Sequence, residues 1–271
     1  MNSKQLAWNV RYDVLQMIHL SHASHIGAAY SVTDILAVLY SDVLHYDVKN
    51  PKSEDRDRLV LSKGHAGSAL YATLAEVGYF DKKLLKTYDQ NGSAFSGHIS
   101  HKGVPGVEFS TGSLGHGVCV ATGLALAGKL NHSNYHVYAI TGDGECDEGS
   151  VWETALFARQ YKLSNFTIII DRNHMQAMGD VSDVMDTTDL RKKFEDFGWN
   201  AVDVDGHDHE ALKKALSKKF NNDYPTCIVA HTIKGKGVSF MENSLLWHYR
   251  DPQGEFYEKA MKELEDSKYE K

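Results

Sequence analysis

Polar residues that could bind a divalent cation follow two predicted strands of this chain. A Gly-Asp-Gly turn at 142–144 comes after the apolar run 135–141, and Asn173 comes after the run 166–171. A helical pattern separates the two runs, which predicts a βαβ unit whose parallel strands end at one edge of a sheet. The spacing therefore predicts that Asp143 and Asn173 lie side by side.

The charge of this turn decides between a plain turn and a ligand site. Residues 142–149 contain four carboxylates and no Lys or Arg, although glycines at a helix N-terminus favour an anion. A bare diphosphate there would meet a repulsion of about 4 kcal/mol for each pair of like charges at 4 Å. Mg²⁺ removes that conflict, because one or two protein oxygens usually hold it together with phosphate oxygens. We therefore infer a metal and diphosphate site; the alternative is a plain turn with an asparagine helix cap.

The overall composition excludes several classes of partner. The net charge is −7 and the pI is near 6.1, whereas nucleic-acid and polybasic membrane surfaces need clustered Lys and Arg. Lysines at 213–219 and 234–236 are interpreted as a solvated helix face or a loop. No apolar run approaches the roughly 20 residues of a membrane span, and the N-terminus has no signal-peptide core. We expect a cytoplasmic protein without nucleic-acid or membrane partners.

Length and residue usage indicate one domain. The four prolines are scattered and leave no proline-rich linker. Cys119, Cys146 and Cys227 lack the spacing of a disulfide framework or a zinc site, so we expect reduced thiols. The prediction is a single domain over 1–271 that ends in a charged helix at 254–271.

Helical periodicity dominates the first part of the chain. Apolar residues recur on one helical face over 6–18 and again over 35–43, which predicts two amphipathic helices. The small and polar residues between them, 21–31, are expected to form an exposed connection. A strand at 58–62 then leads through a turn that contains His65 into another helix.

Alternation of strands and helices dominates the rest. A second strand–helix–strand repeat occupies 199–232. The glycine-rich segment 92–117 is predicted to be a long functional loop. Together these elements predict an α/β fold with a doubly wound, mostly parallel sheet flanked by helices. In such a fold ligands bind beyond the carboxyl ends of the strands.

Six segments, taken in chain order, resemble the transketolase family of thiamine diphosphate enzymes. The resemblance is to the diphosphate-binding domain and covers nearly the whole chain. It implies the thiamine-diphosphate-binding fold, with thiamine diphosphate and Mg²⁺ as cofactors, for which Ca²⁺ or Mn²⁺ can substitute. The segments are SHIGAAYS, LSKGHAGSALY, SGHISHKGVPGVEFSTGSLGHG, the Gly-Asp-Gly to Asn173 motif, VDGH and TIKGKG.

The resemblance also implies roles for the residues of the metal and diphosphate site. Asp143 and Asn173 would ligate the cation, and the backbone carbonyl of Met175 would complete the protein's share. Gly144 would let the backbone approach the diphosphate. Two further cofactor residues are implied, Gly115 in the loop against the cofactor and Glu148 as the family's interface carboxylate.

Four histidines are implied to line the cofactor and substrate site. His65 and His248 would face the diphosphate, whereas His25 and His98 would face the sugar hydroxyls. The catalytic candidates are His25, His98 and His248, because an alkoxide that develops on a sugar carbonyl needs donors or acids that titrate near neutrality.

The chain also departs from the family pattern. Ile26 and Ile99 stand where proline is frequent, and His116 stands where glutamine is common. After His248 the chain reads YRDPQG in place of a small, glycine-containing segment. These departures predict a substrate channel of different shape and an unusual donor sugar.

The family's cofactor-activating glutamate belongs to a pyrimidine-binding domain, for which nothing after TIKGKG is long enough. The expectation is a split enzyme, a heterotetramer of two such chains and two C-terminal subunits that carry that domain. It would transfer a two-carbon ketol unit from a ketose to an aldose, with phosphate or another anion on the sugars. Two alternatives stay open: a different thiamine diphosphate enzyme, such as a 2-oxo-acid dehydrogenase α subunit, and a non-catalytic regulatory paralogue.

Overall fold

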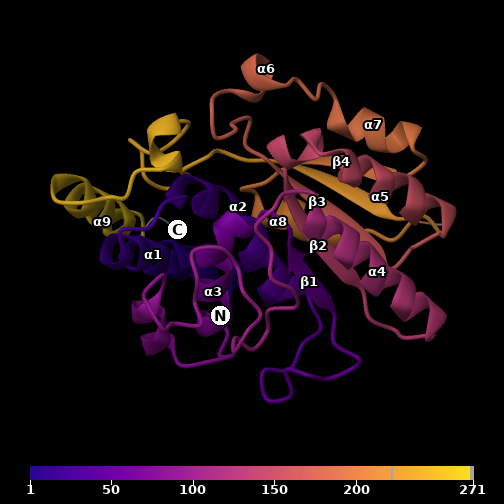
Figure 1. Ribbon diagram of the computed structural model, residues 1–271, viewed down its shortest axis with the longest axis horizontal. Coiled ribbons are helices and arrows are strands. Elements are labelled where there is room, and N and C mark those ends of the chain that lie inside the picture. The colour runs from indigo at the N-terminus through magenta and orange to yellow at the C-terminus, as the bar shows by residue number, and fades with distance from the viewer. Residues whose placement is uncertain (221, 269–271) are drawn as a thin grey trace.

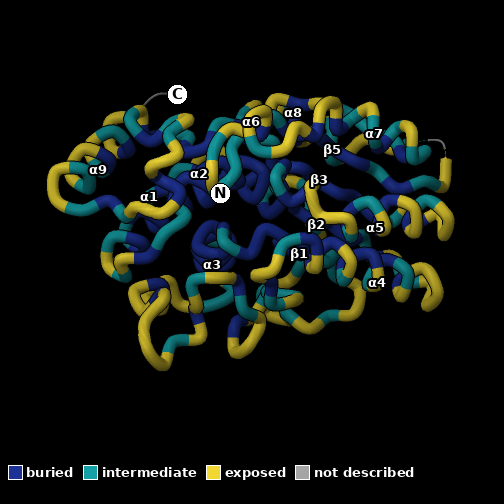
Figure 2. Tube along the Cα trace, turned by 45° about the horizontal axis from the view of Figure 1, so that its top comes forward, coloured by how far each residue is buried: buried dark blue, intermediate teal, exposed yellow. Residues whose placement is uncertain are grey.

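Five strands form one parallel sheet in the part of the chain that the computed structural model describes, residues 1–220 and 222–268 (Figure 1). The strand order is β1-β2-β3-β5-β4, and every neighbouring pair is parallel. Consecutive residues of the central strands are buried, as the sequence predicted, because helices cover both faces (Figure 2). The strands are β1 (Arg58–Leu61), β2 (Val137–Gly142), β3 (Phe166–Arg172), β4 (Asn200–Asp205) and β5 (Thr226–His231).

Helices on the two faces make the sheet doubly wound, which confirms the predicted fold class. Alternate residues of each strand enter opposite cores: Ile140 lies in one hydrophobic cluster and Ala139 in the other. The first cluster packs under α1 (Ser3–Ser21), α2 (Ile26–Val38), α3 (Gly67–Glu76), α8 (His209–Leu216) and α9 (Glu255–Ser267); the second packs under α4 (His116–Leu130), α5 (Gly149–Gln160) and α7 (Leu190–Asp196).

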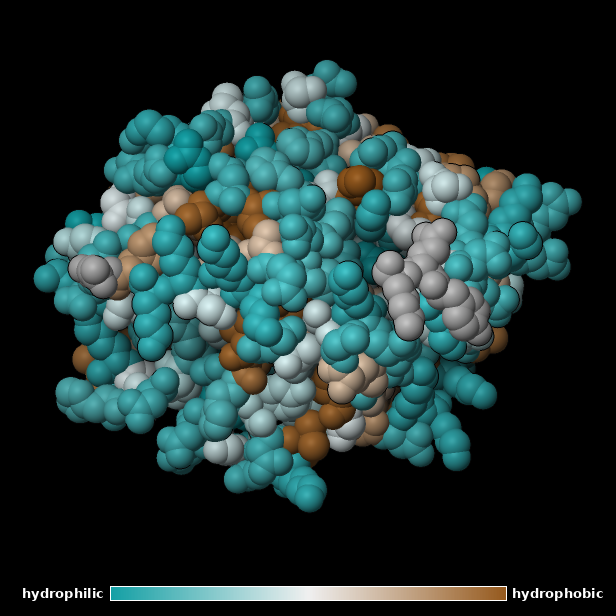
Figure 3. Space-filling model, turned by 180° about the vertical axis from the view of Figure 1, so that it is seen from behind, coloured by the Kyte–Doolittle hydropathy of each residue, from teal (hydrophilic) through white to brown (hydrophobic). Residues whose placement is uncertain are grey.

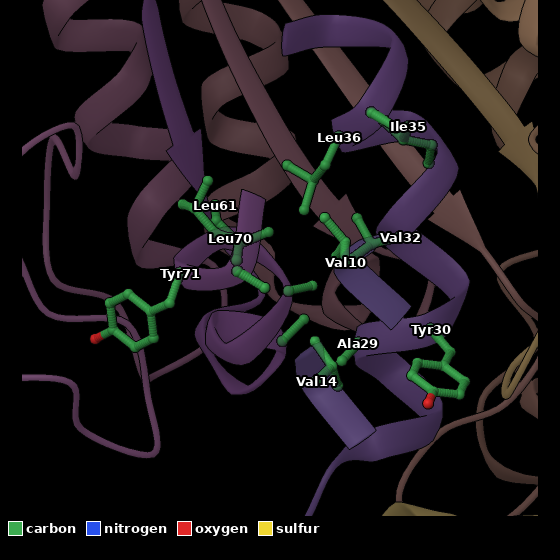
Figure 4. Packing of buried hydrophobic residues seen from close by; sticks show 14 of the residues in the cluster. Val10, Val14, Ala29, Tyr30, Val32, Ile35, Leu36, Leu61, Leu70 and Tyr71 are labelled. Atoms are coloured by element: carbon green, nitrogen blue, oxygen red, sulfur yellow. The ribbon is translucent and has the colours of Figure 1, made fainter. Parts of the chain in front are cut away.

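The first core depends on contacts between α1 and α2. Val10 and Val14 of α1 lie beside Ala29 and Val32 of α2, and all four side chains are buried (Figure 4). Removing a side chain of this size from water stabilises a fold by about 1.5–3 kcal/mol for valine and larger residues. This packing fixes the start of α2, which begins at the cavity described below.

The predicted exposed connection at 21–31 is wrong over most of its length. Helix α2 begins at Ile26, and all 13 of its residues are buried. Gly27 lies against Lys234, since a Cβ atom there would meet Lys234 Cγ at 3.1 Å. Small residues in this segment serve close packing and not chain flexibility, a distinction that composition does not show.

Helix α2 continues through a π-helical turn to Val43, and the stretch 26–43 is long and apolar enough to cross a membrane by length and composition alone. This differs from the sequence-based expectation of no such run. Because 83% of the stretch is buried inside the protein, it is a core helix.

The face seen from behind in Figure 3 is mostly hydrophilic, with separate hydrophobic side chains.

The charged helix predicted at 254–271 is α9, and it packs on α1. Ala260 and Leu264 are buried, and the Trp8 indole N–H donates to the carbonyl of Leu264 at 2.6 Å. Residues 269–271 of that prediction lie outside the described residues.

The glycine-rich segment before α4 is an irregular loop, as predicted, and it is pinned at several points. Its own side chains Phe95, Ile99 and Val104 are buried against the protein. The Arg56 guanidinium forks onto the Glu108 carboxylate and ties the loop to the start of β1. The Arg56 pair holds the loop near the amino end of β1, whereas Thr111 Oγ1, which donates to the carbonyl of Leu61 at 2.6 Å, holds it at the carboxyl edge of the sheet.

Candidate active site

A cavity of about 280 Å³ lies beyond the carboxyl ends of β2 and β3. Parallel α/β sheets bind ligands at this edge. Eight of the residues proposed from the sequence line it together, namely His25, His65, His98, Asp143, Gly144, Asn173, Met175 and His248. A larger cavity of about 550 Å³ lies beside the amino ends of the strands, at the opposite edge.

Two other proposed cofactor residues stand apart from the lining. Gly115 caps α4 with φ +78°, and its N–H donates to Glu145 Oε1 at 2.8 Å. A Cβ atom on Gly115 would meet Ser150 Oγ at 2.3 Å, so only glycine fits there. The structure does not bring Glu148 into the cavity: it is exposed at the start of α5, because the 3₁₀ turn Gly144–Asp147 ends before it and directs the chain outward.

The four carboxylates of the turn divide into two buried and two exposed. Asp143 and Glu145 are buried, whereas Asp147 and Glu148 are exposed. Glu145 accepts hydrogen bonds from Ser62, Gly115 and Gly142, so it supports the loop next to the cavity. The sequence alone did not separate these roles.

Two buried lysines that were not predicted from the sequence reach the cavity. Lys63 and Lys234 are each 1% exposed. Lys63 follows β1 and its Nζ lies 2.5 Å from Asp171 Oδ2. Residues 234–236 lie in a loop, which is one of the two predicted alternatives, but Lys234 is buried there and not solvated. Both lysines stand beside glycines just after predicted strands, and that placement is the signal that could have identified them.

Lys234 is a cation held close to neutral groups. Its Nζ lies 2.8 Å from His248 Nδ1 and 3.3 Å from the carbonyl of Gln176. Burial and the nearby charge of Lys63 lower the pKa of Lys234 to about 8. An anion in the cavity would relieve this repulsion, so a diphosphate there would meet positive charge as well as the carboxylates of the turn.

Asp143 and Asn173 lie together, as their spacing predicted, and their oxygen atoms suit a divalent cation. Asp143 accepts hydrogen bonds only from backbone N–H groups, from His174 at 2.6 Å and Gly144 at 2.9 Å, among the described residues. Burial and the charge of Asp171 raise the pKa of Asp143 to about 6. A buried carboxylate of this kind is stabilised by a cation.

The remaining oxygens of the site come from one short loop. Asn173 Oδ1 accepts from the backbone N–H of Met175 at 3.1 Å, and Asn173 Nδ2 lies 3.2 Å from Ser31 Oγ. In residues 1–220 and 222–268 no cluster of three or more His, Cys, Asp or Glu side chains has metal-binding geometry. The donor set of carboxylate, amide and backbone carbonyl therefore fits a hard cation that phosphate oxygens help to hold.

Four imidazoles stand on the other side of the cavity, with His25 between the others. The His25 ring centroid lies 5.3 Å from that of His65, 5.7 Å from His98 and 5.0 Å from His248. Burial, with repulsion from neighbouring cations and imidazoles, lowers the pKa of His25 to about 4 and that of His248 to about 3. At neutral pH each of these two rings is uncharged and offers one donor and one acceptor.

His25 holds an unusual backbone position that presents its ring to the cavity. It caps α2 with φ +74°, and its N–H donates to the carbonyl of His248 at 2.8 Å. Its buried Nδ1 has no hydrogen-bond partner among the described residues. A buried polar atom without a partner costs free energy, so a hydrogen bond to this nitrogen would stabilise the site.

Comparisons with known proteins agree with this site. The family model described as "Transketolase, thiamine diphosphate binding domain" matches residues 2–252. One subunit of the apulose-4-phosphate transketolase of Phocaeicola vulgatus is 39% identical over 257 residues, with 94% of this chain and 91% of that protein covered. A 6-deoxy-6-sulfo-D-fructose transketolase subunit of Clostridium sp. is 38% identical, with 94% of each chain covered.

The fold is that of solved transketolases. The structure of transketolase from Campylobacter jejuni superposes with a TM-score of 0.90 at 32% identity, covering 98% of this chain. The present chain spans 43% of that longer protein. The chain belongs to the transketolase family of transferases and carries its N-terminal, thiamine diphosphate-binding domain.

Proposed function

We propose that this N-terminal transketolase subunit works with a separate C-terminal subunit to transfer a two-carbon ketol unit from an anionic ketose to an aldose. The observation that carries the proposal is a single cavity in which Asp143 and Asn173 face two buried lysines and four imidazoles. Thiamine diphosphate supplies the carbanion chemistry when it is bound. The residues of this chain hold the cofactor and orient the sugar.

The metal and diphosphate half of the cavity is assigned to the strand ends. Asp143, Asn173 and the carbonyl of Met175 would hold Mg²⁺, and Ca²⁺ or Mn²⁺ would suit the same oxygen donors. Gly144 lines the same cavity, where the absence of a Cβ atom would leave the backbone open to the diphosphate, and it packs against Gln176, whose Cγ a Cβ atom would meet at 2.8 Å. Lys234 adds a positive charge, and an anion nearby raises the basicity of His248 beside it.

The sugar half of the cavity is assigned to His25 and His98. His25 Nδ1, which has no partner among the described residues, can donate to a carbonyl oxygen, or donate to or accept from a hydroxyl group. His98 is exposed at the edge of the cavity and reaches the same space. Together these rings can donate hydrogen bonds that stabilise an alkoxide as it forms, His25 as an uncharged imidazole.

A separate partner is supported by the relatives that this chain matches along most of their length. The apulose-4-phosphate and the sulfofructose transketolase relatives are both named as subunits and not as whole enzymes. We propose a heterotetramer of two such chains and two C-terminal subunits that carry the pyrimidine-binding domain.

The three thiols, Cys119, Cys146 and Cys227, are all free, which supports a cytoplasmic location.

The decisive experiment uses the full chain with its C-terminal subunit, thiamine diphosphate and MgCl₂. Ketol transfer from a ketose phosphate or a sulfonated ketose to an aldose should require both subunits, and light scattering of the pair should give a two-plus-two mass. Full activity of this chain alone would contradict the split enzyme. Turnover of pyruvate without ketol transfer would instead place the protein among 2-oxo-acid enzymes.

A further inference from the structure

A second cluster of charged side chains surrounds Asp34, farther along α2 from the cavity. Asp34 is 5% exposed. The guanidinium of Arg11 donates to Asp34 Oδ1 at 3.0 Å and to Oδ2 at 2.6 Å. Burial would raise the pKa of Asp34, but Arg11 and hydrogen bonds from His207 and His209 outweigh it and hold that pKa well below its usual value. Asp34 is therefore a fixed anion in the folded protein.

The contacts of His207 define its protonation. His207 Nδ1 lies 2.6 Å from Asp34 Oδ2, and the backbone N–H of Ile233 donates to His207 Nε2 at 2.8 Å. Because an amide N–H can only donate, Nε2 must be an unprotonated acceptor, and Nδ1 carries the proton that Asp34 accepts. His207 is thus a neutral imidazole that connects Asp34 to one particular backbone amide.

That amide belongs to the residue before Lys234. On the other side of Lys234, the carbonyl of Lys236 accepts from Arg11 Nε at 2.8 Å. The backbone of Lys234 is therefore clamped on both sides by groups that are themselves bound to Asp34. Gly235 and Gly237, both with positive φ, leave this loop few side chains with which to fix itself, so the clamp adds to two backbone hydrogen bonds, from the Gly235 N–H to the carbonyl of Gly27 and from the Asn243 N–H to the carbonyl of Lys234.

We propose that His207 is a positioning residue that directs Lys234 into the cofactor cavity through the Ile233 amide. The inference rests on the proposed function, in which Lys234 faces the diphosphate. A lysine side chain has four rotatable bonds, so the place of its ammonium depends on a fixed backbone. His207 supplies that fixed point from the loop between β4 and α8, which does not itself reach the cavity.

Two conservative variants separate the contacts of His207. In His207→Asn the amide reaches the place of Nδ1 and keeps the contact with Asp34 but loses the Ile233 amide. In His207→Gln the longer side chain reaches the place of Nε2, so its amide oxygen can again accept a hydrogen bond from the Ile233 N–H. With the full chain, MgCl₂ and the C-terminal subunit, calorimetry should show about 10-fold weaker thiamine diphosphate binding for His207→Asn and a change within about 3-fold for His207→Gln.

A double-mutant cycle shows whether His207 acts through Lys234. In a Lys234→Met background, adding His207→Asn should change thiamine diphosphate affinity by less than about 2-fold, because the group that His207 positions is gone. An equal loss in both backgrounds would overturn the proposal. His132→Asn, an exposed histidine far from the loop, is the control. If His207→Asn does not fold, His207→Ser, which removes both contacts of the ring, takes its place in the cycle with Lys234→Met.

A structural measurement separates failure of this inference from failure of the proposed function. If Lys234→Met binds thiamine diphosphate as the unmodified chain does, the role of Lys234 at the diphosphate is wrong. Crystal structures of His207→Asn then test the positioning alone. Lys234 Nζ should leave His248 Nδ1, from which it lies 2.8 Å away here; retention of that contact would refute the inference.

Discussion

The ammonium of Lys63 lies 2.5 Å from the carboxylate of Asp171, and both side chains are almost completely buried. Asp171 also accepts hydrogen bonds from Ser31 and Thr232. The charge of Lys63 is therefore balanced inside the protein. Lys234, in contrast, donates to no carboxylate among the described residues. The two lysines have different tasks: Lys63 joins separate segments, and Lys234 carries charge available to a ligand.

Replacing Lys234 should therefore weaken cofactor binding. A charged hydrogen bond contributes about 1.5–3 kcal/mol, so Lys234→Met is expected to weaken thiamine diphosphate binding by about 10- to 100-fold. Lys236→Met is the matched control, because that lysine is two residues away and pairs with Glu242 at 3.4 Å near the surface. Calorimetry on the subunit pair measures both. Equal losses in the two variants would contradict the assignment.

Asp143→Asn should remove the dependence of cofactor binding on the metal. Asp143 is 3% exposed, and its carboxylate provides the negative charge of the proposed metal site. Thiamine diphosphate affinity in MgCl₂ is expected to fall at least about 100-fold, toward that of the unmodified pair treated with EDTA.

Asp147→Asn is the control for this prediction. Asp147 lies in the same turn but is exposed, and its carboxylate accepts from the Gln176 amide at 2.7 Å. The affinity of the Asp147→Asn variant for thiamine diphosphate should stay within about 3-fold of that of the unmodified pair, because a surface hydrogen bond contributes little. An Asp143→Asn enzyme that still needs Mg²⁺ at the usual concentration would refute the ligand assignment.

His98→Ala should lower turnover more than cofactor affinity. His98 stands at the mouth of the cavity, 5.7 Å from His25 between ring centroids, and it is assigned to the sugar. Loss of a group that moves or donates a proton lowers kcat by about 10²- to 10⁴-fold. His101→Ala, from the same loop with its ring hydrogen-bonded to Ser110, should keep kcat. A large change in thiamine diphosphate affinity for His98→Ala would move that residue to the diphosphate.

Gly115→Ala should destabilise the fold and disturb the support of Glu145. The backbone has φ +78°, and the new Cβ would meet Ser150 Oγ at 2.3 Å, so a loss of about 2–3 kcal/mol is expected. Gly123 lies in the same helix, exposed and with open space at its Cβ position. Gly123→Ala should stabilise the protein by about 0.5–1 kcal/mol. Urea unfolding at one pH compares the two, and equal effects would contradict the steric argument.

Asp13 should make stability depend on pH. Burial and the neighbouring Glu76 raise the pKa of Asp13 to about 7, despite the ion pair with Lys82 at 2.8 Å. Its unfolded pKa is near 3.8, so the unfolded chain releases this proton first and stability falls as the pH rises from about 4 to 7. Asp13→Asn should flatten that slope and raise the free energy of unfolding at pH 8 by about 1–2 kcal/mol. An unchanged slope would contradict this origin.

The part of the site that follows from strand order could be predicted. Asp143 and Asn173 stand one after each of two consecutive parallel strands, and the geometry of a βαβ unit leaves little freedom in where they meet. The four imidazoles were assigned by resemblance to a family, and the structure brings them to one cavity.

Other features could not be predicted, because they depend on contacts between distant segments. Helix α2 is buried on all sides and so lacks the one-sided apolar stripe that marks an amphipathic helix. Lys63 and Lys234 are far from the acidic turn in the sequence but reach the same cavity, so a count of the charges next to Asp143 in the sequence misses them. Glu145 is buried and Glu148 is exposed because the first lies within one turn of 3₁₀ helix and the second follows it, a difference that residue type does not show.

The stretch 26–43 also has a consequence for biosynthesis. It leaves the ribosome before α8 and the turn Leu245–His248, which both contact α2. Until they arrive, α1 and α3 cover only part of a segment that is apolar enough for a lipid bilayer by length and composition. Nascent chains should therefore engage chaperones that shield such segments, and ribosome-bound fragments ending before residue 209 should aggregate once released.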